Sequence, residues 1–206
     1  LILIHGWAAT RNWWKRILPI KGYQAVIPDL RGHGQSSTGS NFLPTTLAGD
    51  IVELLNSMGI AKESIYVGHS LGGVIAALSA KKSSAKNLVL LSPMIKGEPL
   101  IKSIIVGVLI KRFNTLARRI ITPKTLYNPS KELLEFIWSE SAKGSVDAYI
   151  ELLKTFREIN IIKILRNFDG TKVLIVPEND HVVPPSLQLK LISCVDKVVM
   201  MEKTGH

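Results

Sequence analysis

Cysteine and acidic residues are both scarce in this chain of 206 residues. Cys194 is the only cysteine, so no internal disulfide can form and a disulfide-stabilised scaffold is excluded. The cytoplasm is therefore the expected compartment. Asp and Glu number 16 against 26 Lys and Arg, which gives a formal net charge of +10. Such a basic chain makes nucleic acid and anionic membranes partners to consider.

Long apolar runs and the usual metal motifs are missing as well. The longest apolar run outside the expected core strands is Ile104–Ile110, whereas a membrane-spanning helix needs about 20 residues. No H-E-x-x-H or C-x-x-C occurs, so the sequence implies no metal and no cofactor. The glycine-rich Gly32–Ser37 does not match a dinucleotide-binding motif, because Ser37 stands at the third glycine position.

Strand-like and helix-like segments alternate along the chain. The strand-like runs are apolar throughout, as in a parallel sheet that is covered on both faces. They are Leu1–Ile4, Gln24–Ile27, Ser64–Val67, Leu88–Leu91, Val173–Val176 and Val198–Met201. The alternation predicts an α/β fold with a mostly parallel sheet and flanking helices.

Three helical patterns fall between these strands. The first is expected to have Thr45 or Thr46 as its N-cap and to stop at Gly59. The second runs from about Leu71 to Lys82, and the third follows Pro184. Each one connects two strand-like runs, as the crossover helices of a parallel sheet do.

The whole chain, 1–206, is expected to form one domain. Strand signals stop between 94 and 170, where helical stretches predict an insertion into a core made of 1–93 and 171–206. The chain opens on a strand-like run without Met and ends at His206. Both ends are therefore expected to be cut from a longer protein.

The strongest chemical signal is Gly68-His69-Ser70-Leu71-Gly72, between a strand-like run and a helix. This is the setting of a G-x-S-x-G nucleophile elbow, in which a strained strand-to-helix turn exposes the serine hydroxyl. Glycines on either side let neighbouring backbone approach without Cβ clashes. The motif predicts that Ser70 is a nucleophile, and a purely structural turn is the alternative.

A serine nucleophile needs a base that is held by a third group. His206 follows the last strand and Asp180 follows the run Val173–Val176, so both are expected at the sheet edge where Ser70 lies. The order Ser70, Asp180, His206 is the serine–acid–histidine order of one known fold. Glu178 is the alternative acid, since it follows the same strand.

Together these motifs resemble the α/β-hydrolase superfamily, and in particular its small esterase and lipase-like members. His5-Gly6-Trp7 is similar to the family's oxyanion loop, and Asp29–Ser36 is similar to its D-x-R-G-x-G-x-S stretch. Pro177 departs from the pattern, because the family usually has Gly three residues before the acid. The insertion at 94–170 falls where the family places a cap or lid.

The resemblance implies roles for the loop residues around the elbow. The backbone N–H groups of Trp7 and Leu71 would form the oxyanion hole, which suits a developing negative oxygen. The ring of His69 is expected to point away from Ser70. The expected substrate-pocket residues are His5, Gly6, Trp7 and His69.

The resulting hypothesis is a serine hydrolase that cleaves a small hydrophobic carboxylic ester, such as a monoacylglycerol, through an acyl-enzyme. Lactonase, C–C hydrolase, aminopeptidase and perhydrolase chemistry stay open, because the fold does not choose among them. A serine at position 70, in place of aspartate, argues against an epoxide hydrolase or dehalogenase. The non-enzymatic alternatives are a ligand-binding protein that keeps the triad as a pocket and a peripheral membrane module.

The segment Ile95–Ile121 carries half of the net charge. It has six basic residues and one acid, Glu98, with apolar residues between them. We predict a lid that packs on the active site, and contact with an anionic membrane is the alternative. Nucleic acid is not an expected partner, since no basic motif interleaved with aromatics occurs. The oligomeric state stays open.

Overall fold

The computed structural model describes residues 1–95, 126–156 and 159–206. They contain one five-stranded sheet, whose strands all run parallel in the order β1-β2-β3-β4-β5. This confirms the predicted α/β fold. The strands are β1 (Ile2–Ile4), β2 (Ile65–His69), β3 (Asn87–Leu91), β4 (Thr171–Pro177) and β5 (Lys197–Met201).

The run Gln24–Ile27 is not a strand, which corrects the prediction. It meets the sheet at one parallel bridge, between Val26 and Ile2. Pro28 follows directly and has no N–H to donate to a ladder, and Lys21–Gln24 are exposed. The apolar run is therefore too short to extend the pairing along β1.

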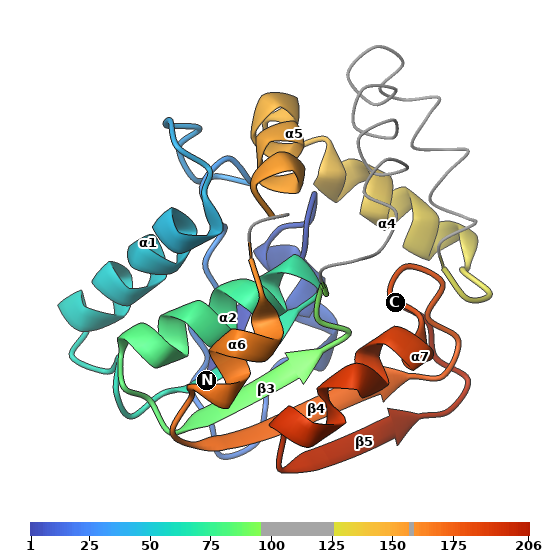
Figure 1. Ribbon diagram of the computed structural model, residues 1–206. Coiled ribbons are helices and arrows are strands. Elements are labelled where there is room, and N and C mark those ends of the chain that lie inside the picture. The colour runs from blue at the N-terminus through green and yellow to red at the C-terminus, as the bar shows by residue number, and fades with distance from the viewer. Residues whose placement is uncertain (96–125, 157–158) are drawn as a thin grey trace.

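Helices cover one face of the sheet (Figure 1). Helix α2 packs on the first three strands, α1 and α6 pack against α2, and α7 with the following 3₁₀ helix η3 packs on β4. A second 3₁₀ helix, η1, follows β1. The helices are η1 (Arg11–Ile17), α1 (Pro44–Ser57), α2 (Leu71–Lys82), α4 (Lys131–Ser141), α5 (Val146–Thr155), α6 (Ile161–Arg166), α7 (Pro185–Gln188) and η3 (Leu189–Cys194).

The start of α1 differs from the prediction, and its end agrees with it. Leu43 is the N-cap in place of Thr45 or Thr46, and Pro44 occupies the first helical position. Proline fits there because its φ is preset for a helix and its missing N–H has no intrahelical partner. Gly59 ends the helix with a φ of 70°, which a glycine adopts without a steric penalty.

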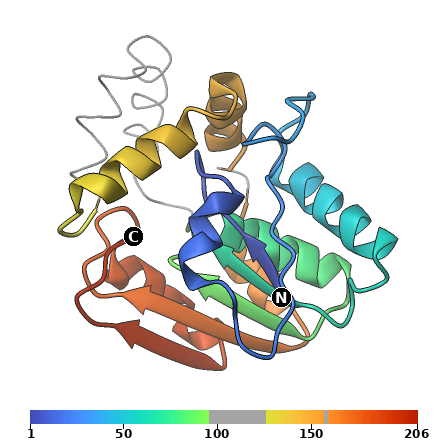
Figure 2. The same ribbon diagram turned by 180° about the vertical axis from the view of Figure 1, so that it is seen from behind.

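The second face of the sheet is only partly covered in the described part of the chain. Side chains that point toward the helices are at most 1% exposed: Tyr66, Leu88, Leu90, Leu174 and Val176. Those on the opposite face are half-buried: Val67, Val89, Val173, Ile175 and Val199. Figure 2 shows β4 and β5 from behind with no described helix over them. The expectation of two covered faces was therefore wrong for this part of the protein.

The carboxyl ends of the strands lie at a common edge because the strands are parallel, and α4 and α5 lie above that edge (Figure 1). The described part of 94–170 contains helices and no strand. That this region acts as a lid stays a prediction, and all but the first residue of Ile95–Ile121 lies outside the described residues. No helix in the described ranges is long and apolar enough to cross a membrane.

Candidate active site

Ser70 lies between the end of β2 and the start of α2, in a strained backbone conformation. Its φ is 55° and its ψ is −120°, a region that costs a non-glycine residue about 1–3 kcal/mol. The neighbouring backbone holds it there: Ser70 N donates to Leu91 O at 2.9 Å, and Met94 N donates to Ser70 O at 3.1 Å. The predicted strand-to-helix turn is therefore present, and adjacent strand ends support it.

The flanking glycines are required by close backbone contacts. A Cβ on Gly68 would lie 2.1 Å from the carbonyl O of Gly72, and a Cβ on Gly72 would lie 2.3 Å from the carbonyl O of His5. Both distances are far below van der Waals contact. The first turn of α2 can thus approach β2 and the loop after β1 only because these positions lack a side chain.

Asp180 follows β4 and is buried, with four hydrogen-bond donors around its carboxylate. Oδ1 accepts from the N–H groups of Val182 at 2.9 Å and Val183 at 2.8 Å. Oδ2 accepts from Gln188 Nε2 at 3.0 Å and from His206 Nδ1 at 2.9 Å. Burial raises the pKa of Asp180, but the histidine and the two amides outweigh burial and hold it below its usual value.

His206 is placed by a short segment after β5. Asn179 N donates to Thr204 O at 2.8 Å, which ties this segment to the turn that carries Asp180. Nδ1 of His206 donates to Asp180, because an ionised carboxylate only accepts, so Nε2 is the nitrogen left to exchange a proton. The His206 ring also lies 4.7 Å from the ring of His69. The imidazole is therefore beside the residue that precedes Ser70.

Glu178 does not share this arrangement. Its Oε2 accepts from the backbone N–H of Lys203 at 3.2 Å, and its own N–H donates to Met201 O. It is an exposed residue of the loop, whereas Asp180 is 3% exposed and faces His206. Of the two carboxylates that follow β4, the structure brings Asp180 to the histidine.

The loop after β1 lies directly against the elbow. A Cβ built on Gly6 would lie 3.2 Å from Ser70 Cβ and 3.1 Å from His69 Nδ1. Trp7 follows, and its indole Nε1 donates to the carbonyl O of Tyr149 in α5 at 2.9 Å. The backbone of Gly6 thus runs beside Ser70, and the oxyanion role of Trp7 stays a prediction.

His5 holds this loop together and has no ring nitrogen left for a substrate. Its Nε2 accepts from Leu30 N at 3.0 Å, so Nδ1 carries the proton and donates to Gly6 O at 2.8 Å. Burial lowers the pKa of His5 to about 4. The enclosed ring fixes the loop, because both of its polar atoms are bonded to backbone, and a place for His5 in a substrate pocket stays a prediction.

The ring of His69 lies beside the imidazole of His206, with ring centroids 4.7 Å apart. It stacks on Trp13 of η1 and contacts His206. Its Nδ1 is buried without a hydrogen-bond partner among the described residues. Burial, with His206 nearby, holds the pKa of His69 well below its usual value. The sequence offered no signal for this packing, because the motif describes only the local turn.

Two contacts join the loop after β1 to α4, and neither was predicted. The carboxylate of Glu140, which is 5% exposed, accepts from the Thr10 hydroxyl, from Asn12 Nδ2 at 2.9 Å and from Lys143. The ring of Trp13 lies 6.2 Å from that of Phe136. The sequence offered no signal for Glu140, because polar residues are common in an amphipathic helix and its partners lie in another part of the chain.

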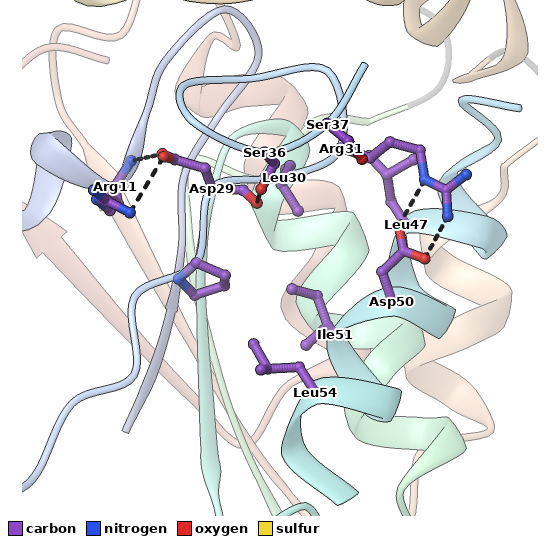
Figure 3. A pocket seen from close by; sticks show the side chains of 11 residues that line it. Arg11, Asp29, Leu30, Arg31, Ser36, Ser37, Leu47, Asp50, Ile51 and Leu54 are labelled. Carbon is purple, nitrogen blue, oxygen red and sulfur yellow. Dashed lines mark hydrogen bonds and ion pairs between the residues drawn. The ribbon is translucent and has the colours of Figure 1, made fainter. Parts of the chain in front are cut away.

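A cavity of about 430 Å³ lies between the Asp29–Ser37 segment and α1 (Figure 3). Its charged groups are already paired. Arg31 binds both oxygens of Asp50, at 2.8 and 2.6 Å, and Asp29 accepts from the backbone N–H of Arg11 and of Gln35. These bonds hold the glycine-rich segment in place.

Comparison with known proteins places these observations in a wider group. A family model described as alpha/beta hydrolase family matches residues 1–206. The non-heme haloperoxidase of Rhodococcus erythropolis is 22% identical over 204 residues, which cover 87% of this chain and 74% of that protein. Lipase 1 of Psychrobacter immobilis is 25% identical over 223 residues, covering 100% of this chain and 70% of that protein.

Solved structures share the fold. An esterase from Exiguobacterium antarcticum superposes with a TM-score of 0.88 at 18% identity, covering 100% of this chain and 84% of that one. At this level of identity, the likeness shows the arrangement of strands and helices and does not identify a substrate.

Proposed function

Since the chain belongs to the alpha/beta hydrolase family, we propose that it is a serine hydrolase that cleaves a carboxylic ester. Ser70 is the nucleophile, His206 the base and Asp180 the residue that orients the base. One observation carries the proposal: His206 is bonded to buried Asp180 and lies against the strained elbow that presents Ser70. A nucleophile, a base and an orienting acid are the parts that acyl transfer needs.

In the first half of the reaction, Ser70 Oγ attacks the ester carbonyl while Nε2 of His206 takes its proton. The tetrahedral intermediate collapses, and His206 returns the proton to the departing alcohol. Water then attacks the acyl-serine with His206 again as base, which releases the acid and restores Ser70. Asp180 holds the imidazole tautomer and stabilises its charged form throughout.

The backbone N–H groups of Trp7 and Leu71 bind the developing oxyanion. Leu71 is the first residue of α2, where the partial positive charge of the helix lies. Gly6 lies against Ser70, which supports a role for the amide of the following residue, Trp7. A donor of this kind contributes about 3 kcal/mol of transition-state stabilisation.

The substrate is a hydrophobic ester, such as a monoacylglycerol or a medium-chain ester. Aromatic side chains near the elbow support this choice. Trp13 stacks on His69, and Phe136 packs against Trp13 from α4. A wall of rings favours an acyl chain over a charged group.

A fluorophosphonate probe and a p-nitrophenyl ester series, from acetate to laurate, test the proposal. The chain is expected to be labelled and to hydrolyse the esters, and Ser70→Ala is expected to lose labelling and at least about 10³-fold in kcat. Ser57→Ala is the matched control, because it makes the same change at an exposed position at the end of α1. Labelling that persists in Ser70→Ala would contradict the role of Ser70. A folded chain without labelling or turnover would indicate a binding protein.

Peroxide chemistry is a second candidate, which the resemblance to a non-heme haloperoxidase favours. A carboxylic acid would acylate Ser70 with loss of water, and hydrogen peroxide would then attack the acyl-serine, releasing a peracid and restoring Ser70. Incubation with acetate, hydrogen peroxide and bromide tests it, because a peracid oxidises bromide. Bromide oxidation that Ser70→Ala abolishes would support this activity.

A further inference from the structure

Gln188 is an enclosed polar residue that contacts the acid of the proposed triad. It is the last residue of α7, and its side chain is fully buried. Nε2 donates to Asp180 Oδ2 at 3.0 Å and to the carbonyl O of Val183 at 2.6 Å. Both partners only accept, so the NH₂ end of the amide must face them. Oε1 is buried and has no hydrogen-bond partner among the described residues.

Oδ2 of Asp180 is therefore shared by two side chains, because Gln188 and His206 both donate to it. A hydrogen bond from a neutral donor stabilises the carboxylate without requiring a charged imidazole. Negative charge on Oδ2 that is stabilised by the amide N–H of Gln188 attracts protonated His206 less strongly. The bond from Gln188 should thus weaken the hold of Asp180 on protonated His206.

We propose that Gln188 is a positioning residue of the Ser70 site, which lowers the proton affinity of His206 by sharing Oδ2 of Asp180. Its importance for catalysis rests on the proposed function; the coupling itself does not. A base that is less readily protonated stays available at lower pH. The second N–H of the amide, bonded to Val183, keeps the turn that presents Asp180 in place.

Few other ionisable groups face His206 from the described elements. Asp180 approaches from the turn after β4, and His69 approaches from the end of β2 with its ring 4.7 Å away. On the neighbouring loop, Glu178 is bonded to the backbone N–H of Lys203. His69 and Glu178 are unchanged by a substitution at position 188, so a shift in the His206 titration reports on the bond to Asp180.

The variant that tests the coupling is Gln188→Met, which keeps the length of the side chain and removes both donors. The midpoint of the His206 titration, followed by NMR, is expected to move upward by about half to one pH unit. The acid limb of kcat/KM for p-nitrophenyl butyrate is expected to move with it. If Gln188 had a merely structural role, the variant would unfold at a lower temperature, but the midpoint of the His206 titration and the acid limb of kcat/KM would stay unchanged. Gln24→Met, the same change at an exposed position, is the matched control.

A measurement on the unaltered chain covers the case in which Gln188→Met does not fold. The side-chain NH₂ resonances of Gln188 are expected to shift with pH at the midpoint of His206, because both share Oδ2 of Asp180. Resonances that ignore that titration, or a folded Gln188→Met with an unchanged His206 midpoint, would overturn the proposal. The NMR titration of His206 and the NH₂ resonances of Gln188 can both be measured on a protein without esterase activity. Failure of the proposed function is therefore distinguished from failure of this inference.

Discussion

The indole ring of Trp13 is stacked on the imidazole of His69, with ring centroids 5.7 Å apart and ring planes inclined by 18°. Trp13 comes from η1 and His69 from the end of β2, next to Ser70. The ring of Phe136 in α4 lies 6.2 Å from the same indole. Three separate elements thus meet in one aromatic wall beside the elbow.

Trp13→Ala is expected to change which esters are preferred. Removing the indole takes away apolar contact with a long acyl chain but little contact with acetate. We expect kcat/KM to fall about tenfold for p-nitrophenyl octanoate and by less than about threefold for the acetate. Tyr23→Ala, at an aromatic residue that is 56% exposed, is the control and should change neither. An equal loss for both esters would show that Trp13 does not contribute to acyl preference.

The two carboxylates after β4 are expected to differ sharply in function. Asp180→Asn should lower kcat by about 10³–10⁴-fold, because the amide no longer selects the productive tautomer of His206. Glu178→Gln should stay within about twofold, since Glu178 binds only the loop backbone at Lys203. Steady-state kinetics of both variants check this. A large loss in Glu178→Gln would reverse the assignment of the acid.

Gly72→Ala is expected to destabilise the fold. The new Cβ would lie 2.3 Å from the carbonyl O of His5, so the loop or the helix must shift, at a cost of about 1–3 kcal/mol. Gly49→Ala is the matched control inside α1, where the nearest atom would be the flexible Lys82 Nζ at 3.5 Å. That change should stabilise the chain by about 0.5–1 kcal/mol. Urea unfolding measures both, and equal effects would argue against the close approach at Gly72.

Two buried histidines should make the protein less stable in acid. Burial lowers the pKa of His5 to about 4 and that of His33 to about 3, whereas both titrate near pH 6.5 when unfolded. Below pH 6.5 the unfolded chain therefore binds protons that the folded chain does not. Stability is full above that pH and falls by up to about 1.4 kcal/mol per pH unit for each histidine, until the folded pKa is reached.

The test is His33→Phe, which keeps an aromatic ring and removes one of these titrations. The difference in unfolding free energy between pH 7 and pH 5 should shrink by about 2 kcal/mol, as measured by urea unfolding at both values. The variant's overall stability does not enter this difference. His181→Gln, at an exposed position, should leave the difference unchanged. If His33→Phe also leaves it unchanged, His33 is not a source of the acid sensitivity.

Prediction from sequence worked where a few neighbouring residues carry the signal. The apolar runs identified the five strands, and the glycines around Ser70 identified the turn, because each depends on local backbone geometry. Prediction from sequence failed at Gln24–Ile27, where Pro28 limits pairing to one bridge. It also failed at the start of α1, where the helix begins at Pro44, ahead of the two threonines. The sequence does not predict the contacts of three side chains, because their partners lie in other elements: Gln188, Glu140 and His69.

Local sequence is sufficient to predict the strand segments and the serine turn, because an apolar run and the glycine spacing around Ser70 are signals carried by a few neighbouring residues. The pairing of Asp180 with His206 depends instead on how β4 and β5 align. Pro177 is paired with Met201, so the two strands end together and their following loops meet. Chain order allowed either Glu178 or Asp180 to reach the histidine. Packing selected Asp180, because only its carboxylate is turned inward, where two backbone amides and Gln188 compensate for its burial.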